Sequence, residues 1–241
     1  MSRYYYDLHL HSCLSPCGDD ESTPNSIVGM ASLCGLNIVA LTDHNSTKNC
    51  PAFFEAAERY GVIPIAGMEL TTAEDIHVVC LFERLNDAMS FDSYIDNHRI
   101  KVKNRPEIFG SQIITDSMDN KIGEIDHLLI IATDISIEQI RSVVDSFNGI
   151  CYPAHIDRNA NGIIAVLGTI PSPDAFGFYE LQDIRVKSEY SKKYGIPENR
   201  LILSSDAHYL TDMRDKDAYI ELDCSSDADS VRKSLFEYLK R

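Results

Sequence analysis

The stretch Asp7-Leu8-His9-Leu10-His11-Ser12 decides the fold, and it follows the apolar run that begins at Tyr4. Its alternation of apolar and polar residues is typical of a β-strand, in which side chains two residues apart share a face. His9 and His11 therefore point to the same side and could bind one metal ion together. The sequence thus predicts a metal-binding pair at the C-terminal end of the first strand.

Four later apolar runs end in the same way, with a histidine or a carboxylate. In a parallel α/β barrel the active site lies at the C-terminal ends of the strands, so residues far apart in sequence converge there. One such pair would be weak evidence, but five strand ends of this kind predict a metal site. Imidazole and carboxylate ligands suit zinc, manganese or iron. The four later stretches are Thr42-Asp43-His44, Met68-Glu69, Ala154-His155 and Asp206-Ala207-His208, whereas His77 begins its apolar run.

Short apolar runs alternate with helical patterns, which indicates βα units around a mostly parallel sheet. A single domain over residues 1–241 is expected, because α/β barrels of about 200–250 residues are common. The polar segment between Glu83 and Asp126, about residues 84–126, is interpreted as a small, mostly helical insertion and a candidate lid. The predicted strands are Tyr4–Leu10, Asn37–Leu41, Val62–Gly67, His77–Phe82, Leu128–Ala132, Ile150–Ala154, Phe176–Leu181, Leu201–Ser204 and Ala218–Leu222, and the predicted helices are Pro24–Leu33, Ser136–Phe147, Arg185–Tyr194 and Ser226–Lys240.

The formal net charge of the chain is −15. Affinity for nucleic acid depends largely on Lys and Arg that neutralise phosphates, so this charge disfavours long nucleic acid as a partner. Two or three divalent ions would add local positive charge, so a small phosphorylated substrate is still expected to bind. No apolar run reaches the roughly 18 residues of a membrane-spanning helix, and the first residues lack a secretory pattern. We therefore expect no membrane partner and a cytoplasmic location.

The five stretches, in order, resemble the motifs of the polymerase and histidinol phosphatase (PHP) superfamily over roughly residues 4–216. The resemblance implies a distorted (β/α)7 TIM-like barrel and a metal-dependent phosphoesterase with two or three divalent ions. It also implies a loop ligand shortly after His11, where this sequence departs from the common spacing; Asp19 is our prediction, with Asp20 or Cys17 as alternatives. The implied ligands are His9, His11, Glu69 and Asp206 for the first ion, Glu69 (bridging), His77 and His155 for the second, and His44 and His208 for the third.

Metal-bound water has a pKa lowered toward neutrality and can attack a phosphate ester, so no Ser, Cys or Asp nucleophile is required. Asp43 or His208 is a candidate proton shuttle to the leaving oxygen, although Asp43 could instead orient His44. Arg158, three residues after His155, is a candidate phosphate clamp, because guanidinium binds phosphate through two hydrogen bonds.

The predicted function is a phosphatase that acts on a small phosphorylated metabolite or nucleotide. Three alternatives stay open: a phosphodiesterase or exonuclease of short oligonucleotides, a metal-dependent amidohydrolase, and a non-catalytic metal-binding domain. If the segment 84–126 is a lid, its basic residues would contact a second phosphate of the substrate. These residues are Arg99, Lys101, Lys103 and Arg105.

Overall fold

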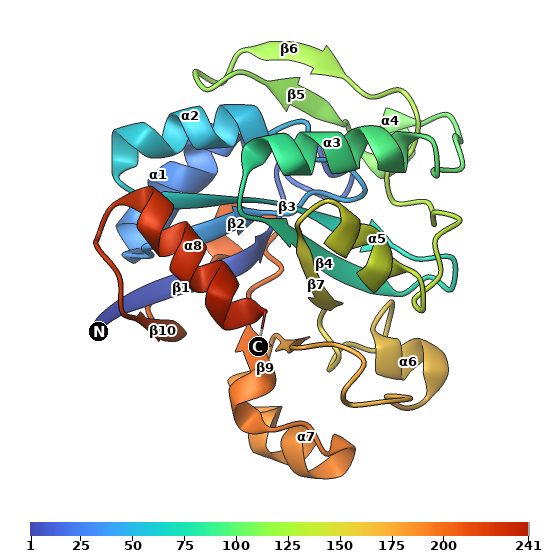
Figure 1. Ribbon diagram of the computed structural model, residues 1–241. Coiled ribbons are helices and arrows are strands. Elements are labelled where there is room, and N and C mark those ends of the chain that lie inside the picture. Colours follow the sequence, from blue (N-terminus) through green and yellow to red (C-terminus); the bar gives the residue numbers. More distant parts are fainter. Residues whose placement is uncertain (241) are drawn as a thin grey trace.

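The structure is a computed structural model that describes residues 1–240, and its centre is a six-stranded mixed sheet. The sheet curls into a half barrel, and helices pack on both of its faces (Figure 1). This architecture confirms the predicted α/β, TIM-like fold, while the count of seven βα units stays a prediction. The sheet has the order β10 (Tyr219–Leu222), β1 (Ser2–Leu10), β2 (Ile38–Leu41), β3 (Ile63–Thr71), β4 (His77–Phe82) and β7 (Ile150–Pro153), and a separate parallel pair joins β8 (Tyr179–Leu181) to β9 (Leu201–Leu203).

Only part of the central sheet is parallel. β1, β2 and β3 pair in parallel, whereas β4 runs antiparallel to both β3 and β7. The turn Thr72–Ile76 is too short for the crossover that a parallel pair needs, so β4 must return alongside β3 as a hairpin partner. As a result, the N-terminal end of β4 lies at the C-terminal end of β3.

Two of the helices, α1 (Pro24–Cys34) and α8 (Ala228–Leu239), begin at residues whose side chains accept a hydrogen bond from a free backbone amide. Thr23 caps α1 by accepting a hydrogen bond from the Ser26 amide, and Gly35 ends it in the left-handed conformation. The side chain of Asp227 caps α8 in the same way. The helices are α1 (Pro24–Cys34), α2 (Cys50–Tyr60), α3 (Leu85–Asp96), α4 (Pro106–Phe109), α5 (Ile140–Ser146), α6 (Ile163–Leu167), α7 (Lys187–Tyr194) and α8 (Ala228–Leu239), with short 3-10 turns at Ile184–Val186, Glu198–Arg200 and Leu210–Asp212.

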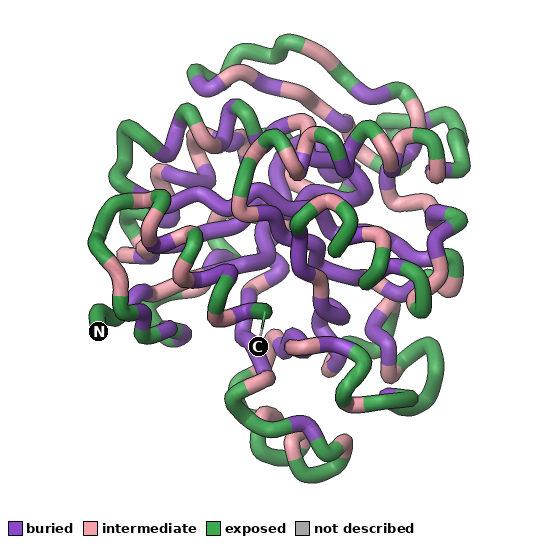
Figure 2. Tube along the Cα trace, in the orientation of Figure 1, coloured by how far each residue is buried: buried purple, intermediate pink, exposed green. Residues whose placement is uncertain are grey.

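The strands of the central sheet are largely buried, as Figure 2 shows, and apolar side chains pack on both of its faces. On one face, Val39 and Leu41 of β2 pack with residues of α1, α2, α3 and α5. On the other face, Ile38 and Ala40 pack with α8 and with β9. Burial on two faces explains why β2 is a continuous apolar run in the sequence, without polar alternation.

One predicted strand is absent from the structure, and helix α2 of the structure is not predicted from the sequence. Residues 128–132 form no strand; the side-chain amide of Asn45 donates to the Leu129 and Ile131 carbonyl oxygens at 2.6 and 3.0 Å, where a strand would have a backbone partner. The second difference is α2, which is missing from the predicted helices although Phe53, Ala56 and Ala57 form its buried face.

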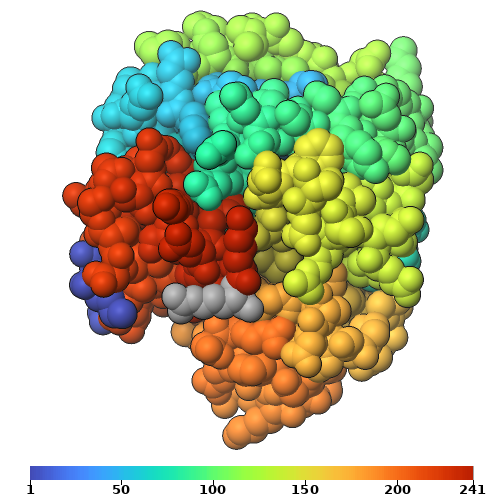
Figure 3. Space-filling model, in the orientation of Figure 1, coloured from blue at the N-terminus to red at the C-terminus, as the bar shows by residue number. Residues whose placement is uncertain are grey.

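The segment 84–126 contains α3, α4 and a hairpin of β5 (Ile113–Thr115) and β6 (Lys121–Glu124). The hairpin is not predicted by the sequence, and its strands are short and largely exposed. In Figures 1 and 3 the segment lies along the upper edge of the molecule. The division of the chain into one domain with an inserted lid stays a prediction.

Among the described residues, 1–240, no helix combines the length and the apolar character that crossing a membrane requires. The cytoplasmic location stays an expectation from the sequence.

Gly67 in β3 is expected to tolerate no larger residue. A Cβ atom there would lie 2.8 Å from side-chain atoms of Leu81 and Thr42 and 2.9 Å from the Cys80 carbonyl oxygen. We expect Gly67→Ala to lower the free energy of unfolding by about 1–3 kcal/mol, as overpacking of a core does. Urea denaturation measures the change. Gly123→Ala in β6, where the nearest atom is 3.5 Å away, is the matched control; equal stability of the two variants would contradict the expectation.

Candidate metal centre

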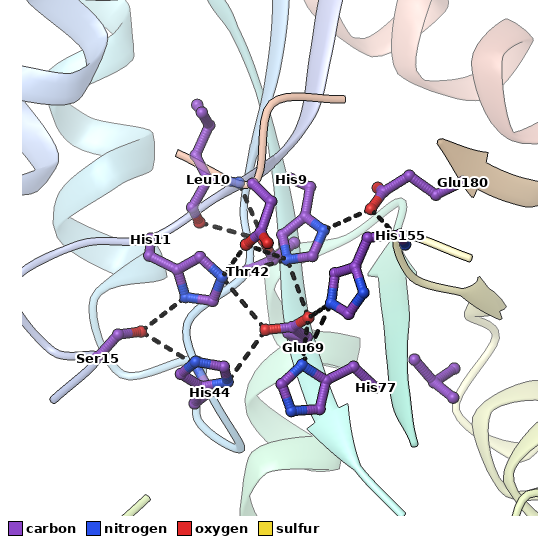
Figure 4. A network of polar contacts seen from close by, with 12 residues as sticks. His9, Leu10, His11, Ser15, Thr42, His44, Glu69, His77, His155 and Glu180 are labelled. Atoms are coloured by element: carbon purple, nitrogen blue, oxygen red, sulfur yellow. Dashed lines mark hydrogen bonds and ion pairs between the residues drawn. The ribbon is translucent and has the colours of Figure 1, made fainter. Parts of the chain in front are cut away.

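Glu69 of β3 lies at the centre of a cluster of histidines (Figure 4). Its side chain is buried, and five imidazole rings approach its two oxygens. The distances to Oε1 are 2.8 Å from His77 Nδ1, 3.0 Å from His155 Nε2 and 3.3 Å from His9 Nε2, and the distances to Oε2 are 3.0 Å from His44 Nδ1 and 3.2 Å from His11 Nε2.

A second carboxylate, Asp206, completes one potential ligand group with His9, His11 and Glu69. Asp206 Oδ1 lies 3.1 Å from His11 Nε2 and 3.4 Å from His9 Nε2. The Nε2 atoms of the two histidines face each other at 3.1 Å. This is the group that the PHP resemblance implies for the first ion.

Two further groups of potential ligand atoms share members with the first. His44, Glu69 and His77 form one group, and His11, His44 and His208 form the other. His155 approaches the second group, because its Nε2 lies 3.3 Å from His77 Nδ1. The structure therefore brings together eight of the nine predicted ligands; the ninth, Asp19, does not join them.

The antiparallel β3–β4 hairpin explains the unusual position of His77 in the sequence. β4 begins at His77, and the register pairs His77 with Thr71 near the end of β3. A residue at the start of an antiparallel strand therefore reaches the same edge as residues at the ends of the parallel strands. His77 begins its apolar run for this reason.

Buried charges dominate the electrostatics of the cluster. Burial alone would raise the pKa of Glu69, but His77, His9 and His44 hold it well below its usual value. Burial lowers the pKa of His11, yet hydrogen bonds to Asp206 and Glu69 raise it overall to about 9. Burial lowers the pKa of His44 to about 4, and burial with the nearby His11 lowers that of His208 to about 3. The cluster thus combines ionised carboxylates with both neutral and protonated imidazoles.

The chemistry of these atoms fits divalent metal ions. His44 Nδ1, Glu69 Oε2 and Asp206 Oδ1 are buried, and the atoms that approach them are other potential ligand atoms. His44 Nδ1 lies 3.0 Å from Glu69 Oε2, and His11 Nε2 lies 3.2 Å from Glu69 Oε2 and 3.1 Å from Asp206 Oδ1. Buried carboxylate oxygens are costly without positive charge nearby, and a divalent ion would supply that charge where they converge with imidazole nitrogens. Imidazole nitrogen with carboxylate oxygen is a ligand set that zinc, manganese and iron accept.

The backbone is strained at the cluster. His155 has a φ of 27°, Asp206 of 54° and Asn45, next to His44, of 46°. Residues other than glycine rarely adopt such angles, and they persist where the surrounding structure fixes them, commonly at functional sites. Two of the three strained residues carry potential ligand atoms.

Glu180 of β8 is a functional candidate that the sequence analysis misses. Its Oε1 lies 2.8 Å from His9 Nδ1 and accepts a hydrogen bond of 3.1 Å from the His155 amide. This contact fixes the proton of His9 on Nδ1 and leaves Nε2 free as a ligand atom. A signal was present in the sequence, since Glu180 is the one charged residue of the predicted strand Phe176–Leu181.

Asp43 lies behind the cluster and does not contact the metal-binding groups directly. Its oxygens accept hydrogen bonds from the Ser12 amide and hydroxyl, both at 2.7 Å, and from the Ser15 hydroxyl at 2.8 Å. The Ser15 oxygen also lies 2.9 Å from His11 Nδ1 and accepts from the His44 amide. Of the two roles open for Asp43, the geometry favours orienting the histidines over shuttling a proton.

The predicted loop ligands lie apart from the cluster. Asp19 Oδ1 accepts a hydrogen bond of 2.8 Å from the Glu21 amide, so it stabilises its own turn. Asp20 and Cys17 are exposed, and neither belongs to a potential ligand group among the described residues. The third group therefore consists of His11, His44 and His208 without a loop residue.

Arg158 reaches the cluster through Asp206. Its Nη1 forms an ion pair with Asp206 Oδ2, an oxygen that also accepts a hydrogen bond of 3.1 Å from the Gln182 side chain. Nearly half of the Arg158 side chain, 45%, is exposed. The guanidinium therefore lies between a ligand carboxylate and solvent, where an incoming anion would meet it.

Loss of the Glu180 carboxylate is expected to weaken metal binding while the fold persists. Glu180→Gln keeps the shape of the side chain but removes the charge behind His9, and partners of this kind typically change metal affinity about 10- to 100-fold. Titration calorimetry with manganese measures the affinity. Glu221→Gln, on the exposed part of β10, is the control; equal affinity of the two variants would contradict the role of Glu180.

Metal binding is expected to release protons and to strengthen as the pH rises from 7 to 9. The pKa of His11 is about 9, so the ring is protonated at pH 7 and must lose a proton before it can bind a metal ion. Affinity should rise by up to about tenfold per pH unit for each proton displaced, and the part of the rise that comes from His11 should end above about pH 9. Calorimetry at pH 7 in two buffers of different ionisation enthalpy counts the protons. An affinity that does not change between pH 7 and 9 would contradict this assignment.

Comparisons with known proteins agree with the site. The model of the PHP domain family matches residues 7–156, which include six of the eight clustered residues; the other two, Asp206 and His208, lie beyond the match. Among curated relatives, an error-prone DNA polymerase of Symbiobacterium thermophilum is 35% identical over 77 residues, 32% of this chain and 7% of the polymerase. A 5′-3′ exoribonuclease of Haemophilus influenzae is 34% identical over 89 residues, 35% of this chain and 31% of the exoribonuclease. The chain thus spans less than a third of either relative.

Solved structures share the fold at low sequence identity. The lesion-specific endonuclease EndoQ of Pyrococcus furiosus has a TM-score of 0.63 and 17% identity, covering 98% of this chain and 56% of the endonuclease. A protein of Bifidobacterium adolescentis assigned as a metal-dependent phosphoesterase has a TM-score of 0.55 and 16% identity, covering 84% of this chain and 87% of that protein.

One of these comparisons corrects the sequence analysis on nucleic acid. Endonuclease Q has also been solved with a 27-mer duplex that carries an abasic lesion at the active site, with a TM-score of 0.61, 19% identity, and coverage of 96% of this chain and 56% of the endonuclease. The exclusion of long nucleic acid on the basis of net charge is therefore wrong. The charge of a whole chain does not describe the potential at one face, where basic side chains and metal ions act locally. From the family match over most of its length, this chain belongs to the PHP domain family.

Proposed function

We propose that this chain is a metal-dependent phosphoesterase that hydrolyses the phosphate ester of a nucleotide or another small phosphorylated metabolite. The observation that carries the proposal is the buried Glu69, whose two oxygens meet five imidazole rings beside a second carboxylate. Neighbouring ligand groups that share Glu69 suit two or more ions close together, and such pairs promote in-line displacement at phosphorus.

Bound divalent ions would supply two things here, a water of lowered pKa and positive charge for the phosphate oxygens. Other residues of this chain then hold the ligand side chains in place. Glu180 holds His9, while Ser15 and Asp43 hold His11 and His44. Each contact removes a rotation that would misplace a ligand atom.

Two groups at the open side of the cluster are proposed to act on the substrate. His208 is 21% exposed, more than any other residue of the ligand groups, and its Nδ1 lies 2.8 Å from the Asp206 carbonyl oxygen. Nδ1 therefore donates to that carbonyl, and Nε2 is left to bind a metal ion or to hold a proton near the leaving oxygen. Arg158 is proposed to bind a non-bridging phosphate oxygen from its place beside Asp206.

A phosphodiesterase that acts on oligonucleotides is the second candidate, and the likeness of fold to endonuclease Q favours it. The amidohydrolase alternative has less support, because the model of the PHP domain family matches residues 7–156. A non-catalytic role is also less well supported, because eight potential ligands are retained in contact with one another.

Phosphate release from a panel of substrates tests the proposal. With manganese added, we expect the chain to release inorganic phosphate from one class among histidinol phosphate, sugar phosphates, nucleoside monophosphates and nucleotide bisphosphates. Glu69→Gln should lose this activity by a factor of 10³ or more, roughly the size expected when the shared metal charge is lost. Circular dichroism checks that this variant is folded.

A chelator should abolish the release and manganese should restore it. The proposal fails if metal-loaded protein releases no phosphate from any member of the panel and also cleaves no diester. Turnover that persists in Glu69→Gln would show that the reaction occurs elsewhere on the chain.

A further inference from the structure

An exposed stretch of residues 100–109, here called the rim segment, combines basic and apolar side chains. Ile100, Val102, Ile108 and Phe109 are exposed by 57%, 45%, 56% and 36%. Isolated exposed apolar residues are ordinary on protein surfaces, but four among ten consecutive residues are not scattered singly. Between them lie the exposed basic residues Lys101, Lys103 and Arg105.

The basic side chains of the rim segment differ in how free they are. Lys101 forms an ion pair of 2.9 Å with Asp96, whereas Lys103 and Arg105 form no ion pair with any described residue. The Arg105 guanidinium lies over the Phe109 ring, 5.8 Å from its centroid. Arg99, just before the segment, is buried and bonded to Asp96 and to the Asn45 carbonyl oxygen, so it is not available to a phosphate.

The rim segment is anchored to the loops that leave the metal centre. On one side, Arg99 Nη1 donates at 2.8 Å to the carbonyl oxygen of Asn45, the residue after His44. On the other side, Gly110 lies against Pro16 with a φ of 91°, and a Cβ there would be 2.1 Å from the Pro16 carbonyl oxygen. Only glycine allows this approach. Phe109 and Arg105 are thereby held next to the loop that follows His11.

That loop also borders the open side of the cluster. Its Asp19 amide donates a hydrogen bond of 3.0 Å to the carbonyl oxygen of His208, the most exposed residue of the ligand groups. The rim segment, this loop and His208 therefore form a continuous border from the surface to the metal centre. These two contacts, of Gly110 with Pro16 and of Asp19 with His208, place the rim segment beside the loop that reaches His208.

The charge of this border contrasts with that of the whole chain. Residues 99–110 contain four basic residues and one acidic residue, Glu107, in a chain with 22 basic and 37 acidic residues. The acidic groups Asp96 and Asp126 lie nearby. Asp96 is bonded to Arg99 and Lys101, whereas the Asp126 carboxylate is exposed and lies 3.5 Å from His127 Nδ1. A polyanion repelled elsewhere on the chain would find its phosphates matched here by Lys103 and Arg105.

We propose that the rim segment binds the continuing strand of a single-stranded oligonucleotide whose terminal phosphate enters the metal centre. Lys103 and Arg105 contact backbone phosphates, and Phe109 stacks on an unpaired base. Basic groups interleaved with an exposed aromatic ring are the usual elements of sequence-independent binding to single strands. This inference rests on the proposed function and selects an oligonucleotide end from the substrates that it leaves open.

The burial of the metal centre favours a strand end over an intact double strand. Side chains of Glu69, His9 and His11 are at most 1% exposed. A phosphate within a base-paired helix cannot reach such depth without leaving the helix, whereas a terminal nucleotide can. A base that stacks on Phe109 must likewise be unpaired.

Steady-state hydrolysis of one extended substrate and two small esters tests the inference. A 5′-phosphorylated ten-residue oligothymidylate is the extended substrate, and bis(p-nitrophenyl) phosphate with p-nitrophenyl phosphate is the small reference. We expect Lys103→Ala/Arg105→Ala to lower the ratio of kcat/KM for the oligonucleotide to that for the small ester by about tenfold or more, mainly through KM. For this variant, the slope of log(kcat/KM) for the oligonucleotide against log salt concentration should fall in magnitude by about 1.4, because each phosphate contact to a single strand contributes about 0.7.

Two further variants separate charge from base stacking. Phe109→Ala should raise KM for the oligonucleotide at least about fivefold, the smallest effect expected from one lost stacked base. Lys103→Arg/Arg105→Lys keeps the charge and should restore most of the affinity. Lys192→Ala/Lys193→Ala on α7 removes two exposed lysines far from the rim segment and should change neither substrate.

The outcomes distinguish this inference from the proposed function. If the small esters are hydrolysed but the rim variants do not change the oligonucleotide kinetics, or change them no more than the α7 control, the rim segment is not the binding surface. Hydrolysis of small esters with none of the oligonucleotide, or preference for the same strand annealed to its complement, also overturns the inference. No hydrolysis of any substrate by metal-loaded protein overturns the proposed function itself.

Discussion

The contact on which the rest of the structure depends is that between the Glu69 carboxylate and the imidazoles around it. A carboxylate this deeply buried would be protonated or expelled without positive charge nearby. The pKa of Glu69 is instead held well below its usual value, because His77, His9 and His44 surround it. Removing the Glu69 carboxylate would leave the protonated His11 ring, buried beside it, without one of its two carboxylate partners. The sheet, its turns and the supporting hydrogen bonds can therefore be understood as the means by which these side chains are kept together.

The mixed pairing of the sheet serves this arrangement. β1 and β2 are parallel neighbours of β3, so their C-terminal ends bring His9, His11 and His44 to Glu69. The antiparallel β4 then supplies His77 from its beginning, a position that a parallel strand could not use. Around this group, Glu180, Ser15 and Asp43 fix the rings from behind. The strained backbone at His155 and Asp206 is consistent with ligand geometry that the surrounding packing imposes.

Charge on this chain is distributed unevenly, and the unevenness bears on function more than the total does. A net charge of −15 describes the average surface. The free cations of the rim segment and any metal ions at Glu69 act over distances shorter than about 10 Å, the range over which salt screens exposed charges. A strongly acidic protein can therefore still present a local surface that suits phosphates. The comparison with endonuclease Q shows that the fold itself is compatible with a nucleic-acid substrate.

The sequence by itself determined the fold class and the membership of most of the site. Alternating residues in Asp7–Ser12 and histidines at successive strand ends are local patterns, and periodicity reveals them without knowledge of the partners. The α/β fold follows from the same alternation of runs. The strand expected at 128–132 failed because a side-chain amide, that of Asn45, takes the place of a backbone partner, and no local pattern shows which donor a carbonyl will meet.

Only the tertiary structure decided how these residues act. Asp43 and His44 are adjacent in sequence, yet His44 points to Glu69 while Asp43 holds Ser12 and Ser15. Glu180 was missed because a carboxylate in an apolar strand gains meaning only from His9, 171 positions away. Asp19 was predicted as the loop ligand that the family resemblance implies, but its side chain stabilises its own turn. The physical reason is common to all three: sequence spacing fixes which face a side chain lies on, whereas its partner depends on contacts between segments distant along the chain.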